Sequence, residues 1–184
     1  MTNRILLTYH SEEGQTAKIA DHIATRIRAF GSDIDVATAE SDPSVIGYGG
    51  VIVGDSIHVG QHSRELRGWI ARHRDGLDGA PTALFQVSLA SATDDDVHHS
   101  EARSRVNQLL DDTGLTPDMV AMFGGAIAYT SYGWLKRRIM HHIASRDLGD
   151  TDTSQDYEYT DWDAVDAFAV DAVALFTGDV AELA

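Results

Sequence analysis

The sequence predicts an α/β fold, in which a parallel β-sheet is covered by helices on both faces. Short apolar runs typical of buried strands alternate five times with segments of helical periodicity. A crossover helix is the natural connection between parallel strands, so this alternation favours a parallel sheet. The chain has 184 residues, 43% hydrophobic and 23% charged, which is a globular composition. No internal repeat or linker is present, so we expect one domain over residues 1–184.

Three strands and one helix are predicted in the first part of the chain. An apolar run at residues 5–9 predicts the first strand, and apolar residues at helical spacing over 19–30, followed by Gly31, predict the first helix. Residues 34–37 predict the second strand. The β-branched run Val51–Val53 is bounded by glycines, which is typical of a strand buried on both faces.

The same alternation continues to the end of the chain. Apolar side chains mark helices around residues 66–70 and 106–110, and the runs at 83–87 and 119–123 predict the fourth and fifth strands. A last helix is predicted from the apolar spacing over 165–176. The elements therefore follow a strict strand–helix order, apart from the direct succession of strands two and three.

The sequence also predicts the cap of the last helix and the location of two tryptophans. Residues Thr160, Asp161, Trp162 and Asp163 resemble a capping box with Asp in the position of Glu, which would make Thr160 the cap. Trp69 and Trp162 are expected to pack in the core rather than stack on a cofactor.

Acidic residues dominate the charge of the chain. The formal net charge is −15 and the pI is about 4.7. Such a surface repels phosphate, so DNA or RNA binding is not expected. The acidity fits either a dedicated partner surface or a general solubility adaptation to a salt-rich cytoplasm. We favour the second interpretation, because Lys18 and Lys136 are the only lysines.

Several chemistries and locations are excluded or disfavoured by the sequence. Cysteine is absent, which rules out disulfides, thiol catalysis and thiolate metal sites on this chain. His58 and His62, like the pairs at 98–99 and 141–142, have no evident third ligand, so no metal is expected. No apolar run reaches the roughly 18 residues needed to span a bilayer, and no signal-peptide profile precedes the first strand. We therefore expect a cytoplasmic protein.

The loop Ser11–Thr16 is the most informative candidate site. It follows the first strand and precedes the first helix, and ligands of open α/β sheets bind beyond the carboxyl ends of the strands. Gly14 allows close backbone approach, and the helix N-terminus favours an anion such as phosphate. The alternative is an ordinary helix cap at Ser11 with a turn glycine. The loop is neither a Walker A motif nor Gly-x-Gly-x-x-Gly.

Several motifs together resemble one known family. The first loop resembles the FMN phosphate loop of flavodoxins. More widely, the chain resembles the quinone-linked, flavodoxin-like protoporphyrinogen IX dehydrogenases of haem biosynthesis, over about residues 3–176. The motifs that carry this resemblance are Gly14-Gln15-Thr16, Gly54-Asp55-Ser56-Ile57, Gly124-Gly125-Ala126, Gly149-Asp150-Thr151-Asp152-Thr153 and Tyr159-Thr160-Asp161-Trp162.

This resemblance implies a fold, a cofactor and a set of binding residues. The fold would be a flavodoxin-like, doubly wound, five-stranded parallel sheet of order 2-1-3-4-5. FMN would lie at the switch point between the first and third strands, as it does in flavodoxin itself. Ser11, Gly14, Gln15 and Thr16 would hold the phosphate. The implied cofactor-binding residues are Ser11, Glu12, Glu13, Gly14, Gln15, Thr16, Ser56, Ile57, His58, Ser88, Leu89, Ala90, Ser91 and Gly125.

A segment without acidic residues suggests a second functional surface. Residues 119–146 contain no Asp or Glu, where about four would be expected by chance. It overlaps a helical insertion expected at about 126–160, after the fifth strand. The functional interpretation is a basic and aromatic lip for porphyrin propionates, a quinone or an anionic membrane surface; the alternative is a solvated helix. The lip would consist of Tyr129, Tyr132, Trp134, Arg137 and Arg138.

The resemblance thus implies an FMN-dependent oxidoreductase. It would oxidise protoporphyrinogen IX to protoporphyrin IX and pass the electrons to a quinone such as menaquinone, with peripheral attachment to the inner face of the membrane. No catalytic base can be named from the sequence. The alternatives are a flavodoxin-type electron carrier and a flavin-free relative. The acid-free segment favours the enzyme, and the lack of Trp or Tyr in 55–62 and 88–92 counts against the carrier.

Overall fold

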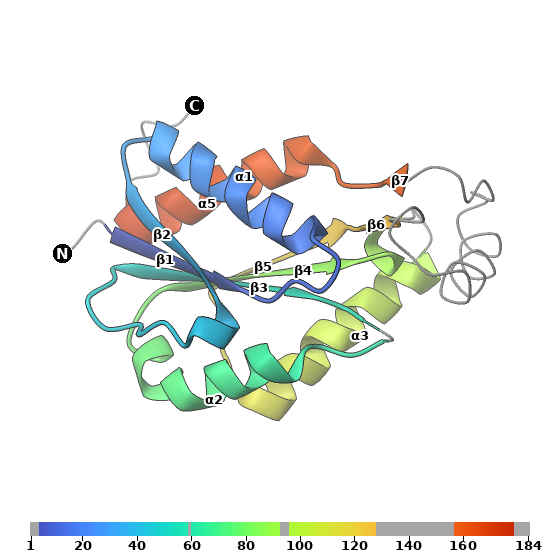
Figure 1. Ribbon diagram of the computed structural model, residues 1–184, viewed down its shortest axis with the longest axis horizontal. Coiled ribbons are helices and arrows are strands. Elements are labelled where there is room, and N and C mark those ends of the chain that lie inside the picture. Colours follow the sequence, from blue (N-terminus) through green and yellow to red (C-terminus); the bar gives the residue numbers. More distant parts are fainter. Residues whose placement is uncertain (1–3, 59, 93–95, 128–156, 179–184) are drawn as a thin grey trace.

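Five parallel strands form the central sheet in the order β2-β1-β3-β4-β5 (Figure 1). The computed structural model describes residues 4–58, 60–92, 96–127 and 157–178. The order confirms the fold that the resemblance implied. The strands are β1 (Arg4–Tyr9), β2 (Asp33–Thr38), β3 (Gly50–Ser56), β4 (Thr82–Ser88) and β5 (Met119–Gly124).

Helices cover both faces of this sheet. Helix α1 packs against α5 on one face, and α2 and α3 lie together on the other (Figure 1). The predicted helices are thereby confirmed. Their bounds are α1 Gln15–Ala29, α2 Arg64–Leu77, α3 Asp96–Thr113 and α5 Trp162–Thr177, with short 3-10 turns at Ala39–Ser41 (η1) and Ala90–Ala92 (η2).

Two apolar cores lie between the sheet and these helix layers. The first joins alternate residues of the strands, such as Ile52 and Phe85, to the buried faces of α1 and α5. The second joins the opposite side chains of the strands to α2 and α3, and includes the fully buried Trp69. Trp69 therefore packs in the core as predicted, and its indole Nε1 donates to the Pro43 carbonyl at 2.9 Å. Trp162 packs against the first core.

One predicted helix cap, Thr160, is wrong, and the alternative in which Ser11 caps the first helix does not hold either. Helix α1 is not capped by Ser11, because its N-cap is Gly14, with a φ of 92°. Helix α5 is capped by Asp161 instead of Thr160: Asp161 Oδ1 accepts from the amides of Asp163 (3.0 Å) and Ala164 (3.1 Å). The Ser11 hydroxyl instead closes the local turn by accepting from the Gly14 amide, whereas the Thr160 hydroxyl makes contacts with residues distant in sequence, which local spacing does not reveal.

A small second sheet follows β5. Strands β6 (Ala126–Ile127) and β7 (Tyr157–Glu158) pair antiparallel and lie at the same end of the molecule as the carboxyl ends of β4 and β5 (Figure 1). They close the base of the expected insertion. Its helix and the predicted lip fall within residues 128–156, outside the described residues.

Candidate functional site

The predicted site loops meet at the carboxyl edge of the sheet. The His10 amide donates to the Gly54 carbonyl at 3.0 Å, which joins the ends of β1 and β3. The Ile57 amide donates to the Val87 carbonyl at 2.8 Å, and the Gly125 amide donates to the Ser88 carbonyl at 3.1 Å. The loops after β1, β3, β4 and β5 therefore form one continuous surface.

The first loop has the geometry of an anion cradle. Ser11 Oγ accepts from the Gly14 amide at 3.1 Å and so closes the turn. The N-cap residue of α1, Gly14, provides no side-chain cap, and no acidic residue lies in the first turn. A Cβ on Gly14 would meet nothing within 4 Å, so the space beside it is open. These amides fit a phosphate, because helix N-termini provide unsatisfied N–H donors and a positive dipole end.

The remaining phosphate-loop residues differ in their exposure. Thr16 is buried, Gln15 is half-buried, and Glu12 and Glu13 are exposed. Gln15 Nε2 donates to Thr160 Oγ1 at 2.8 Å, and that hydroxyl in turn donates to the Gly124 carbonyl at 2.8 Å. Gln15 thus faces Thr160. The sequence did not point to a site role for Thr160, although this residue belongs to the Tyr-Thr-Asp-Trp motif.

The second loop, Ser56–His62, folds as a hairpin over the end of β3. The amides and carbonyls of His58 and Gln61 exchange two hydrogen bonds of 3.0 Å. His58 Nδ1 lies 3.3 Å from Glu12 Oε2, so this hairpin touches the first loop. Ser56 Oγ is buried without a hydrogen-bond partner among the described residues. An unpaired buried hydroxyl at this edge is a group that a bound cofactor can satisfy.

A buried carboxylate and imidazole support this hairpin. His62 Nδ1 lies 2.9 Å from Asp55 Oδ2, and the exposed fractions of the two side chains are 4% and 0%. An ionised Asp55 can only accept a hydrogen bond, and in that state His62 Nδ1 is the donor. Neither residue was predicted to belong to the site. A carboxylate two positions after the apolar run Val51–Val53 was the available signal.

The third loop closes the site from β4. The hydroxyls of Ser88 and Ser91 are hydrogen-bonded to each other at 2.8 Å, and the Ser91 amide donates to Ser88 Oγ at 3.2 Å. Leu89 and Ala90 are half-buried beside them. A Cβ on Gly125 would lie 3.5 Å from the Ser88 carbonyl carbon, so Gly125 lies directly against this loop.

An ion pair joins the start of α1 to β7. The Lys18 ammonium contacts Glu158 and lies 5.1 Å from the centre of the Trp162 ring. The Lys18 ammonium is the main reason that the pKa of Glu158 lies below its usual value. Trp162 Nε1 also donates to Glu158 at 2.7 Å. This network lies at the outer surface and fixes β7 to α1.

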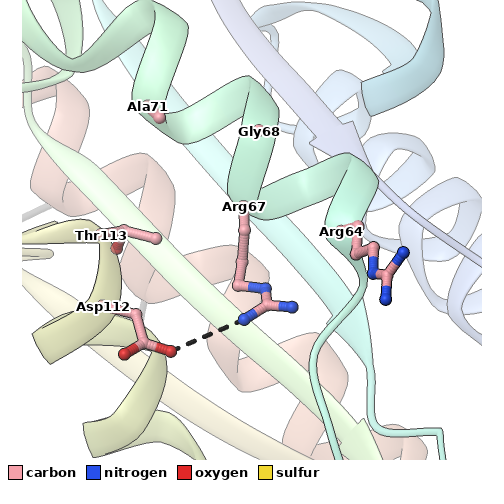
Figure 2. Close-up of a pocket in the computed structure, with 6 residues that line it drawn as sticks. All are labelled: Arg64, Arg67, Gly68, Ala71, Asp112 and Thr113. Atoms are coloured by element: carbon pink, nitrogen blue, oxygen red, sulfur yellow. Dashed lines mark ion pairs between the residues drawn. The ribbon is translucent and has the colours of Figure 1, made fainter.

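A separate cleft lies between the start of α2 and the end of α3 (Figure 2). Arg67 extends toward Asp112 across it, with 3.6 Å between the guanidinium and carboxylate atoms. None of the predicted cofactor residues lines this cleft. Its lining residues are Arg64, Arg67, Gly68, Ala71, Asp112 and Thr113.

Metal clusters and membrane-spanning helices are both absent from the described ranges. Within 4–58, 60–92, 96–127 and 157–178, no group of three or more His, Asp or Glu side chains is arranged to hold a metal ion. None of the described helices is long and apolar enough to cross a membrane. The predicted lip residues Tyr129, Tyr132, Trp134, Arg137 and Arg138 lie outside the described part of the chain.

Curated relatives are similar to this chain over most of its length. It is 29% identical over 168 residues to the protoporphyrinogen IX dehydrogenase [quinone] of Escherichia coli K12, covering 90% of this chain and 92% of the relative. It is also 29% identical over 180 residues to the protein of the same name from Leishmania major, covering 94% and 75% of the two chains. These names agree with the activity that the resemblance implied.

Solved structures and a family model extend the comparison. Flavodoxin 1 from Bacillus cereus has a TM-score of 0.52 at 17% identity, covering 97% of this chain and 99% of its own. The rubredoxin oxygen:oxidoreductase of Desulfovibrio gigas has a TM-score of 0.56 at 14% identity, and this chain spans only 37% of that protein. Both show the shared fold. The family model described as "Flavodoxin domain" matches residues 6–154. The chain therefore belongs to the flavodoxin-domain family.

Proposed function

We propose that this protein is an FMN-dependent oxidoreductase that oxidises protoporphyrinogen IX to protoporphyrin IX with a quinone as electron acceptor. The observation that carries the substrate assignment is the 29% identity, over 90% of the chain, with enzymes of that name. The cofactor assignment rests on membership of the flavodoxin-domain family and on the uncapped start of α1.

In this proposal, each loop of the carboxyl edge has a role in holding the cofactor. The amides of Ser11–Thr16 bind the phosphate, with the α1 dipole adding to the attraction. Ser56, Ile57 and His58 line one side of the ring, and Ser88–Ser91 line the other. When bound, FMN would supply the redox chemistry, and the protein would supply position and electrostatics.

Glu12 and Glu13 place negative charge on the phosphate loop. The contact between Glu12 and His58, 3.3 Å apart, directs one of these carboxylates toward the second loop.

The cofactor assignment is tested by titration. The purified protein should bind FMN, and Thr16→Ala should weaken binding by about 1.5–3 kcal/mol if its hydroxyl donates to the charged phosphate. Failure to bind FMN, or unchanged binding by the variant, would refute the phosphate-loop assignment.

The reaction is tested by anaerobic mixing of the FMN-loaded protein with protoporphyrinogen. The visible flavin absorbance should bleach and then recover when quinone is added. Bleaching by a general reductant such as dithionite, without bleaching by the porphyrinogen, would favour the flavodoxin-type electron carrier.

The membrane and substrate role of the basic lip is also part of the proposal. Reversing both charges (Arg137→Glu and Arg138→Glu) should leave FMN binding intact but slow turnover with porphyrinogen and quinone. Binding to anionic liposomes should weaken by about 1 kcal/mol per basic residue at modest ionic strength, where salt does not screen the attraction. If the double variant turns over with a soluble quinone as fast as the parent and binds liposomes equally well, the segment is the solvated helix of the alternative interpretation.

A further inference from the structure

A buried, hydrogen-bonded pair of an aspartate and a histidine lies at the base of the hairpin of the second loop. Asp55 ends the apolar face of β3 that contains Val51 and Val53, where it is fully buried. Its Oδ2 lies 2.9 Å from His62 Nδ1 and accepts from the Ser63 amide at 2.9 Å. Asp55 Oδ2 therefore holds both His62 and Ser63, at the end of the hairpin, to β3 at its start.

This arrangement is unfavourable for stability by itself. Burying a carboxylate removes it from water, and well-packed apolar side chains often replace buried ion pairs without loss of stability. Hydrogen bonds compensate the loss of hydration only in part, since Asp55 Oδ1 and His62 Nε2 have no hydrogen-bond partner among the described residues. A gain in fold stability does not explain the pair, whereas control of the loop geometry does.

The hairpin has few other restraints. Only the two hydrogen bonds between His58 and Gln61 join its arms within the described residues. Gly60 turns the chain with a φ of 73°, and a Cβ there would lie 3.4 Å from the Arg105 guanidinium of α3. Ser56 is the last residue of β3 and the Ile57 amide donates to Val87, so the closure at the base of the hairpin acts mainly on the segment from His58 to Gln61 and on how firmly it is held beside Ser56 and Ile57.

We propose that Asp55 and His62 are positioning residues that clamp this hairpin and preorganise the ring-side wall of the flavin site. The inference rests on the proposed function, because it assumes that Ser56–His58 contact the ring. Neither side chain touches the cofactor in this proposal. Both act by holding the loop in its binding geometry before the cofactor arrives, which removes an ordering penalty from binding.

Two substitutions at His62 separate the clamp from general packing. The Asn side-chain nitrogen is as many bonds from Cα as His Nδ1, so His62→Asn keeps the donor to Asp55. The Gln nitrogen is one bond farther away, so His62→Gln removes that donor while remaining polar. The double variant Asp55→Val with His62→Leu deletes the pair and leaves no unpaired charge. Thr8→Val is the matched control, because Thr8 of β1 is fully buried and its Oγ1 has no hydrogen-bond partner in the described part of the chain.

The first measurement uses the cofactor-free protein. Hydrogen exchange at the His58 and Gln61 amides should be roughly tenfold faster in the double variant and in His62→Gln than in the parent. The amides of β3 and β4 should keep their parental rates. His62→Asn and Thr8→Val should match the parent. Parental exchange at both hairpin amides in the double variant would overturn the clamp.

The second measurement compares FMN with riboflavin, which lacks the phosphate. If Asp55 and His62 clamp the ring-side wall, the double variant and His62→Gln should bind FMN and riboflavin equally more weakly than the parent, by roughly tenfold. The visible spectrum of the bound flavin should also shift. His62→Asn should restore affinity and spectrum. A merely structural role would change the melting temperature but neither flavin affinity, and that result overturns the inference. A parent that binds no flavin, with accelerated hairpin exchange in the variants, would refute the cofactor assignment and support the clamp alone.

Discussion

At Gly54 the backbone of β3 lies against the ring of Phe85. A Cβ on Gly54 would lie 2.2 Å from Phe85 Cζ, closer than real atoms approach. Phe85 has no room to retreat, because its ring centre lies 5.9 Å from that of Phe123 and 6.0 Å from that of Phe168. The glycine of the Gly-Asp-Ser-Ile motif therefore has a packing reason, independent of any cofactor.

We predict that Gly54→Ala destabilises the fold by about 1–3 kcal/mol through overpacking. Urea unfolding measures the change. The matched control is Gly79→Ala, where the nearest atom would lie 3.7 Å away, in ordinary contact. Gly79→Ala should change stability by less than about 0.5 kcal/mol. Equal effects of the two substitutions would contradict the packing explanation.

A second residue-level prediction concerns Asp35 at the edge of the sheet. Its carboxylate accepts from the Tyr48 hydroxyl and contacts Arg4, both at 2.6 Å. The Tyr48 hydrogen bond, followed by Arg4, holds the pKa of Asp35 below its usual value. A depressed carboxyl pKa stabilises the fold above the unfolded value of about 3.9, and this stabilisation is lost as the pH falls through the folded pKa.

Tyr48→Phe should therefore lower the free energy of unfolding by about 1 kcal/mol near neutral pH, a modest figure because Asp35 is 39% exposed. The difference from the parent should shrink as the pH falls below about 4. Denaturant unfolding at several pH values measures it. A difference that stays constant down to about pH 3 would show that the hydroxyl does not act through the Asp35 charge.

At the scale of elements, Thr160 connects α1 to β5. Gln15 opens α1 and donates to the Thr160 hydroxyl, which donates to Gly124 at the end of β5. Thr160, which follows β7, thus fixes the start of α1, the helix whose N-terminus we propose to face the phosphate. Three residues of the Tyr-Thr-Asp-Trp motif thus have structural roles. Thr160 bonds to Gln15, Asp161 caps α5, and Trp162 contacts Lys18.

We expect Thr160→Val to weaken FMN binding about fivefold, because it removes both hydrogen bonds while keeping the side-chain shape. Thr160→Ser should retain the affinity. Riboflavin should bind Thr160→Val as it binds the parent, because the displaced element faces the phosphate. Equal weakening of both flavins would instead indicate a general distortion of the site.

At the scale of the whole molecule, the net charge of −15 sets the response to salt. Carboxylate repulsion is strong at low ionic strength, and the screening length shortens from about 10 Å at 0.1 M salt to about 3 Å at 1 M. The melting temperature should rise between low and molar potassium chloride. A flat or falling melting temperature would contradict this, and an equal rise in sucrose would indicate solute exclusion instead of charge screening.

The alternation of elements and much of the core could be predicted from the sequence. Ile19, Ile23 and Ile27 recur at helical spacing and are fully buried. The β-branched run Val51–Val53 likewise became a buried central strand. Periodicity predicts such features because a helix or strand must turn its apolar side chains to one face or to both. The order of the strands came from the family resemblance, since local patterns contain no information on which strands are neighbours.

What the amino-acid sequence by itself determined, then, was which segments are strands and helices and which side chains are apolar and buried, and it also placed the loop for which we propose phosphate binding. The tertiary structure alone decided the partners of the polar side chains. Thr160 has the spacing of a cap but bonds to Gln15, 145 positions away. Asp55 and His62 are seven positions apart, yet their contact depends on a hairpin that only the packed sheet edge supports. The physical reason is that apolar burial follows local periodicity, whereas a hydrogen bond requires two particular atoms to meet, and folding brings these atoms together.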